Sequence, residues 1–124
     1  MGAVLAYIGA ALVAGWGVAH TVPTRQVLAS FEPITTDNRR IILQEWLAEA
    51  LTMWGIAAVV IAATAVPGTA TDIRAWVYRA AAALLIALGT LTALTGARTP
   101  VVWFKICPVL LASSALLLLI ASLQ

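Results

Sequence analysis

Four long stretches of the chain contain no Asp, Glu, Lys or Arg, and this pattern constrains the fold more than any motif. They cover residues 1–24, 50–71, 80–97 and 106–124. A helix needs roughly 20 residues to cross a ~30 Å hydrocarbon core. The sequence therefore predicts an all-α integral membrane protein, with residues 1–124 forming a single up-down-up-down four-helix bundle.

Composition agrees with this interpretation. Hydrophobic residues make up 63% and charged residues 10% of the chain, whereas an average soluble domain is roughly 25% charged. The single cysteine, Cys107, excludes an internal disulfide and any site built from a cysteine pair. The net charge of +2 is too small to indicate a nucleic-acid-binding surface, so we expect no nucleic-acid partner.

The four spans are expected at residues 3–21, 38–66, 72–95 and 100–123. The longest connection, residues 22–37, is expected to lie at the membrane surface on the cytoplasmic side. Within it, residues 24–31 have the pattern of a short interfacial helix. Val27, Leu28 and Phe31 would face lipid in that helix.

The second span has a plausible start signal in Asp37, whose carboxylate can accept from free amide groups of the first turn. Because this span is about 43 Å long at 1.5 Å per residue, its first turns should extend among the lipid phosphates, with Arg39 and Arg40 there. Thr99 followed by Pro100 is a favourable beginning for the fourth span.

Basic residues predict the orientation. Five of them lie in or beside the first and third connections, namely Arg25, Arg39, Arg40, Arg98 and Lys105, and two lie beside the second, Arg74 and Arg79. Cytoplasmic loops carry the excess of Lys and Arg. We therefore expect a multi-pass protein of the bacterial inner membrane with both termini outside.

Tryptophans and small residues add weaker indications. Trp46 and Trp103 are expected at the cytoplasmic edge, where tryptophan is enriched, and Trp54 is expected to pack between helices. Small residues also recur at a spacing of four in the first span, as Ala6, Ala10 and Ala14 and as Ala11, Gly15 and Ala19. Such ridges favour close helix packing, either inside the bundle or in a homo-oligomer.

Ionisable residues within the spans are the main functional clue, because a charge at the bilayer centre costs about 2.5–3.5 kcal/mol on insertion scales. Glu45 and Glu49 are one helical turn apart, so either one carries a proton or a cation lies nearby. His20 and Lys105 lie at the same membrane side. Pro108 leaves a backbone carbonyl free beside Lys105. We predict that these groups form one polar pocket in the cytoplasmic half, closed by the interfacial segment 22–37.

The same residues also have structural interpretations. Glu45 and His20 are compatible with ordinary solvated positions at the interface. The side chains of Lys105 and Arg79 can extend to the two membrane surfaces. Glu49 is the hardest to explain in this way, and a structural salt bridge competes there with a functional role.

One segment resembles a known group of proteins. Residues 20–49 are similar to a stretch found in small uncharacterised bacterial four-span integral membrane proteins, through His20, Pro23, Phe31, the run from Asp37 to Arg40, Glu45, Trp46 and Glu49. The resemblance implies the compartment and the number of spans, and no activity. Small multidrug-resistance transporters are comparable in size, but their essential glutamate lies in the first span, where this chain has no carboxylate.

Three functions are compatible with these features. The first is binding of a membrane lipid, a hydrophobic small molecule or a membrane-protein partner through Glu49, Glu45, His20 and Lys105. The second is a proton-coupled transporter working as a homo-oligomer, with Glu49 exchanging the proton. The third is a redox subunit in which His20 binds a metal or haem. No catalytic residues or specific cofactor can be assigned, and no metal-ligand motif is present.

Overall fold

The computed structural model describes all 124 residues and is entirely helical, without strands. Its long helices are α1 (Gly2–Thr21), α3 (Thr36–Ala65), α4 (Thr71–Leu94) and α5 (Val102–Ala121). Two short elements connect them, α2 (Thr24–Ala29) and the 3-10 helix η1 (Gly96–Arg98). The four long helices are each long and apolar enough to cross a membrane, which indicates a multi-pass membrane protein.

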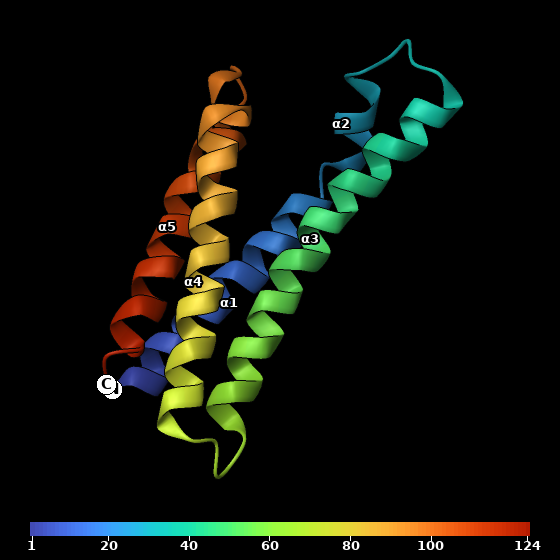
Figure 1. Cartoon of the computed structure of the whole chain (residues 1–124). Helices are drawn as coiled ribbons and strands as arrows, with labels where there is room; N and C mark the ends of the chain where they lie inside the picture. The colour runs from blue at the N-terminus through green and yellow to red at the C-terminus, as the bar shows by residue number, and fades with distance from the viewer.

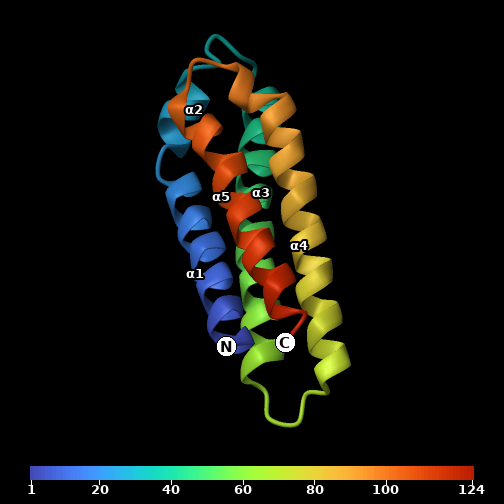
Figure 2. The same ribbon diagram turned by 90° about the vertical axis from the view of Figure 1, so that its left-hand side faces the viewer.

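The long helices lie side by side in a bundle (Figure 1). The two chain ends and the 66–70 turn lie at one end, and α2 and the α4–α5 connection lie at the other (Figure 2). α1 packs against both α3 and α5, and α4 packs against α5, whereas α3 and α4 contact each other much less. In Figure 1, α3 leans away from α4 and α5 toward the end that carries α2.

Small residues let α1 approach its neighbours closely. Ala6 and Ala10 are 0% and 1% exposed and lie in the core. A Cβ atom on Gly9 would come within 3.3 Å of the Ser114 carbonyl oxygen on α5. The first small-residue ridge thus packs largely inside the bundle. The second ridge faces outward and consists of the exposed residues Ala11, Gly15 and Ala19.

The outer surface is apolar on all four long helices. Only 24 of the 124 residues are buried, so most large apolar side chains face outward, including Val59, Leu91, Val109 and Leu116. An apolar cavity of about 280 Å³ also lies between α3 and α4, lined by Gly55, Ile56, Val59, Val77, Ala80, Ala81 and Leu84. An aqueous surface rarely exposes so much contiguous apolar area, whereas lipid tails solvate it well.

The helix starts differ from the sequence prediction. α3 begins at Thr36, and the side chain of Thr35, not Asp37, caps it by accepting from the Asn38 amide at 3.2 Å. Asp37 already lies within the first turn, where its carboxylate accepts from Arg40 Nη1 at 3.4 Å. Acidic residues in the first turn interact favourably with the helix dipole without being the cap.

The fourth long helix begins later than predicted. Thr99 and Val101 both have extended backbones, and α5 begins at Val102 without a side-chain cap. The residue before a proline avoids the helical region, and this accounts for the extended Thr99 before Pro100. The expectation that Leu28 faces lipid was also wrong. It is 6% exposed on α2, which packs against α3.

Candidate functional site

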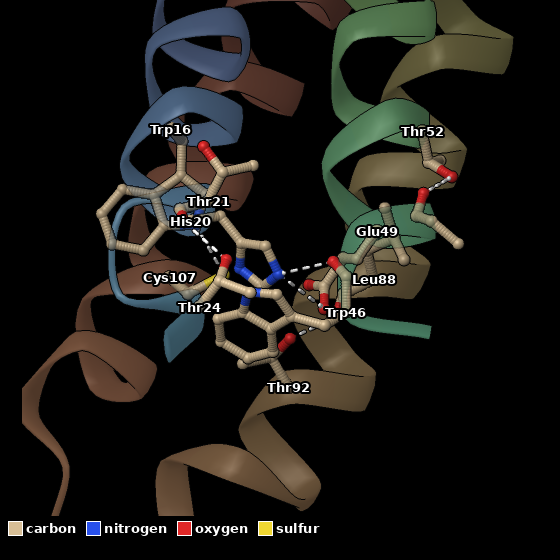
Figure 3. Close-up of polar contacts among 11 residues, drawn as sticks. Trp16, His20, Thr21, Thr24, Trp46, Glu49, Thr52, Leu88, Thr92 and Cys107 are labelled. Carbon is tan, nitrogen blue, oxygen red and sulfur yellow. Dashed lines mark hydrogen bonds and ion pairs between the residues drawn. The ribbon is translucent and has the colours of Figure 1, made fainter. Parts of the chain in front are cut away.

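An aromatic stack joins the last turn of α1 to α3 and forms the centre of the candidate site. The imidazole of His20 lies parallel to the indole of Trp46, with ring centroids 3.8 Å apart and planes inclined by 20°. His20 Nε2 also donates to the backbone carbonyl of Trp46 at 3.1 Å. His20 is only 8% exposed. Figure 3 shows the two rings between α1 and α3.

Glu49 completes this group, which we call the His20–Trp46–Glu49 cluster. Glu49 follows Trp46 by three residues on α3, a spacing that places both side chains on one helix face. Its Oε2 lies 3.7 Å from His20 Nε2, and its side chain is 31% exposed (Figure 3). This distance is an ion-pair contact that is too long for a hydrogen bond. No protein group donates a hydrogen bond to the Glu49 carboxylate.

Trp46 has an unused polar group of its own. Its indole Nε1 is buried and has no hydrogen-bond partner. The indole also meets the ring of Phe104 edge-on, at a centroid distance of 6.2 Å and an angle of 86°, which brings α5 to the cluster. The site therefore contains an under-satisfied acceptor at Glu49 and an unsatisfied donor at Trp46.

A second polar contact beside the cluster ties α1 to α5. Trp16 precedes His20 by four residues, one turn of α1, and its Nε1 donates to Cys107 Sγ at 3.1 Å. Cys107 is 4% exposed, as expected for a small packing residue. Trp16 and Cys107 both appear in Figure 3, on the side of His20 away from Glu49.

The structure brings together only part of the predicted pocket. Glu45 is exposed and forms no ion pair, and Lys105 is also exposed and unpaired. Pro108 lies inside α5, which continues through it, and its backbone packs near Gly89 of α4. Of the four ionisable residues predicted to meet, His20 and Glu49 are the pair that the structure places in contact.

The remaining predicted residues lie at the surface of the bundle. Arg39 Nη1 is 2.6 Å from Glu32 Oε1, and Arg40 Nη1 is 3.4 Å from Asp37 Oδ1, in two exposed ion pairs. Exposed pairs of this kind contribute about 0–1 kcal/mol. Arg79 is exposed too and donates to Ser122, directly after α5. None of these groups contacts the cluster.

Sequence reasoning missed the aromatic part of the site. It did not predict that Trp46 stacks on His20, and it assigned no role to Phe104 or to the Trp16–Cys107 contact; the position of Trp46 at the membrane edge stays a prediction. A signal was present in the helical spacing. Trp16 shares a face with His20, and Trp46 shares a face with Glu49, so each ionisable residue carries a tryptophan one turn before it.

Metal binding has little support in this geometry. No group of three or more His, Cys, Asp or Glu side chains lies close enough together to hold a metal ion. His20 and Glu49 form an ion pair, but no third such side chain joins them to complete a metal-ligand group.

The chain matches no protein-family model, no curated protein and no solved structure. The resemblance of residues 20–49 to small bacterial four-span membrane proteins stays a prediction.

Proposed function

We propose that this chain is an integral inner-membrane protein, with the long helices crossing the bilayer up-down-up-down, that binds a hydrophobic molecule bearing a polar group. The His20–Trp46–Glu49 cluster is the binding point. The ligand belongs to the lipids or amphipathic small molecules, because it has to reach a group surrounded by four apolar helices. No chemical step is needed for this role.

The observation that carries the proposal is the unsatisfied polarity of the cluster. The Glu49 carboxylate accepts no hydrogen bond from the protein, and its one ion-pair partner is His20 Nε2, at 3.7 Å. The Trp46 indole N–H is buried without an acceptor. Buried polar groups of native proteins are almost always paired, and each unpaired one costs about 1–3 kcal/mol. A ligand with a hydroxyl, amine or amide group offers a donor to Glu49 and an acceptor to Trp46.

The aromatic rings supply the apolar part of the recognition. His20 stacks on one face of the Trp46 indole, and the indole meets the ring of Phe104 edge-on. This arrangement limits the rotation of the indole, so its N–H is pre-oriented. A pre-oriented group loses less conformational entropy on binding than a mobile one. Partial exposure of the Glu49 side chain, at 31%, leaves the carboxylate accessible to a ligand.

Native mass spectrometry of protein released from a mild detergent tests the proposal. The wild type is expected to carry a reproducible extra mass, identifiable by lipid and small-molecule analysis of the same preparation. Glu49→Gln should lose most of that mass, whereas Glu45→Gln should keep it, since Glu45 is exposed, unpaired and one turn away. Equal retention by the two variants, or a wild type without any bound mass, would refute binding at the cluster.

A second function is favoured by one specific contact, the His20–Glu49 pair. Histidine and glutamate inside a membrane bundle are the usual members of proton relays in transporters. A homo-oligomeric proton-coupled transporter would use Glu49 as the exchanging carboxyl. In proteoliposomes loaded with a pH-sensitive dye, a proton flux carried by the wild type and lost in Glu49→Gln would support transport. A bare homodimer in the native mass spectrum would favour it over ligand binding.

A further inference from the structure

A polar cavity lies at the opposite end of the bundle from the His20–Trp46–Glu49 cluster. It has a volume of about 290 Å³ and opens between the ends of α1, α4 and α5, beside the two chain ends. α4 contributes Thr71, Arg74 and Tyr78 to its wall, and Ser122 contributes from the end of α5. The Tyr78 hydroxyl is already paired with Thr64 Oγ1, 2.7 Å away. Arg74 is therefore the charged side chain that remains for a ligand.

The guanidinium of Arg74 is incompletely paired. Its Nη2 donates to the Thr69 carbonyl at 3.3 Å, but its Nε is buried and has no hydrogen-bond partner. Arg74 forms no ion pair, and neither does the nearby Asp72. The Arg74 side chain is half-buried, and a charged N–H that is shielded from water is costly unless an acceptor, above all an anionic one, comes to it.

A second guanidinium lies outside the cavity lining but is bound to Ser122, which belongs to that lining. Arg79 Nε donates to Ser122 Oγ at 3.3 Å, and Arg79 Nη2 lies 3.5 Å from the Ser122 carbonyl. The same guanidinium lies 5.7 Å from the centroid of the Trp76 ring, in a cation–π contact. Arg79 also has no carboxylate partner. Arg74 is therefore the guanidinium in the cavity lining, and Arg79 places a second uncompensated positive charge beside the cavity through its contact with Ser122.

The type of anion follows from the donors. A guanidinium presents parallel N–H groups that match two oxygens of a phosphate, and it keeps its charge at any physiological pH. The first turn of α4 has no side-chain cap, so its free amides add to the positive potential beside Thr71. We infer that this cavity is a phosphate-binding site, and that the phosphate is carried by an anionic phospholipid or by a free phosphate compound.

The test uses delipidated wild-type protein in detergent, titrated with phosphatidylglycerol and followed by native mass spectrometry. Diacylglycerol with the same acyl chains is the matched lipid without phosphate. Arg74→Gln should weaken phosphatidylglycerol binding by about tenfold, the effect of losing a charge-assisted hydrogen bond. Arg98→Gln is the control, because Arg98 is exposed and unpaired in the α4–α5 connection. It should change binding by less than about twofold.

Further arms separate the sources of the phosphate and guard against misfolding. Inorganic phosphate is added as a competitor of the lipid. If it displaces the lipid, and raises the melting temperature of the wild type but not of Arg74→Gln, the ligand is a free phosphate compound. Absence of such competition would indicate the lipid headgroup. Arg74→Lys keeps the charge and replaces Arg74→Gln in the test if the glutamine variant fails to fold. It should bind phosphatidylglycerol more weakly than the wild type but more strongly than diacylglycerol. Equal lipid binding by Arg74→Gln and Arg98→Gln, or equal binding of diacylglycerol and phosphatidylglycerol, would overturn the inference.

Discussion

The imidazole Nε2 of His20 faces two acceptors of α3 at once, the Trp46 carbonyl at 3.1 Å and Glu49 Oε2 at 3.7 Å. Both partners can only accept while Glu49 is ionised, so Nε2 carries the hydrogen in this arrangement. Stacking on Trp46 holds the ring in the plane that makes both contacts. The orientation of His20 is therefore determined by α3, although His20 itself belongs to α1.

The first prediction concerns the His20–Glu49 pair. His20→Phe preserves an aromatic ring for stacking on Trp46 but removes the Nε2 hydrogen. We expect a loss of about 1–3 kcal/mol in the free energy of unfolding, because Glu49 loses its one ion-pair partner. The measurement is denaturant unfolding in detergent micelles.

Glu49→Gln in the His20→Phe background completes a double-mutant cycle for the same pair. The double variant should regain at least half of the lost stability, since a neutral amide does not need a cation. If His20→Phe is as stable as the wild type, the two side chains are not energetically coupled.

The second prediction concerns the packing of Trp54 on α1. A Cβ atom on Gly17 would lie 2.6 Å from Trp54 Nε1, which donates to the Ala14 carbonyl at 3.2 Å. Gly17→Ala should therefore displace the indole and destabilise the bundle by about 1 kcal/mol. Gly15→Ala is the control, since nothing lies within 4 Å of its Cβ position. It should be neutral or slightly stabilising in thermal melts, because alanine favours helix. Identical melting temperatures of Gly17→Ala and Gly15→Ala would argue against the contact between Trp54 and α1.

The third prediction concerns the contact between α1 and α5 at Cys107. Cys107→Ala leaves Trp16 Nε1 without its acceptor and should reduce stability by about 1 kcal/mol. Cys107→Ser retains an acceptor at nearly the same place and should lose less. Comparison of the two variants in the same denaturant titration separates the hydrogen bond from side-chain volume. A serine variant less stable than the alanine variant would mean that the cost of burying the hydroxyl outweighs the hydrogen bond.

The fourth prediction uses two neighbouring serines of α5. The Ser114 hydroxyl is buried and has no partner, whereas the Ser113 hydroxyl is exposed and donates to the Val109 carbonyl at 2.8 Å. Ser114→Ala removes an unsatisfied buried group and should raise stability by about 0.5–1 kcal/mol. Ser113→Ala should change stability by less than about 0.5 kcal/mol. A destabilised Ser114→Ala would reveal a partner, such as a buried water.

The fifth prediction concerns orientation. In a Cys107→Ala background, a single cysteine at Thr69 should react with a membrane-impermeant maleimide in intact cells whose outer membrane has been permeabilised. A cysteine at Ser30 should react only after lysis, because the basic residues favour the α2 side as cytoplasmic. Ser30 is exposed and Thr69 is half-buried; both lie in connections between helices, at opposite ends of the bundle. The reverse labelling pattern would invert the orientation and leave the fold unchanged.

Local sequence features predicted the four long helices because each charge-free stretch lies largely within one of them, although α3 and α4 begin well before their stretches do. The structure has all-helical architecture and four long apolar helices, as predicted. Helix starts were less predictable. Thr35 and Asp37 are both good caps, and the choice between them depends on where the preceding loop becomes extended.

The site was predictable only in part, because its contacts depend on how each helix is rotated about its own axis. His20 and Glu49 meet, whereas Glu45, one turn away on the same helix, faces outward. A spacing of four leaves two side chains about 40° apart, enough for one to be half-buried and the other exposed. The two small-residue ridges of α1 raise the same problem, since identical spacing gave one buried and one exposed ridge.

The apolar cavity between α3 and α4 has a consequence for every stability measurement on this protein. The cavity has a volume of about 280 Å³ and is lined by side chains of both helices, which otherwise make few contacts with each other. In a bilayer or micelle, hydrocarbon chains of the surrounding amphiphile fill such a space. We therefore expect the amphiphile to form a replaceable part of the packing between α3 and α4, so that unfolding free energies differ between short-chain and long-chain detergents.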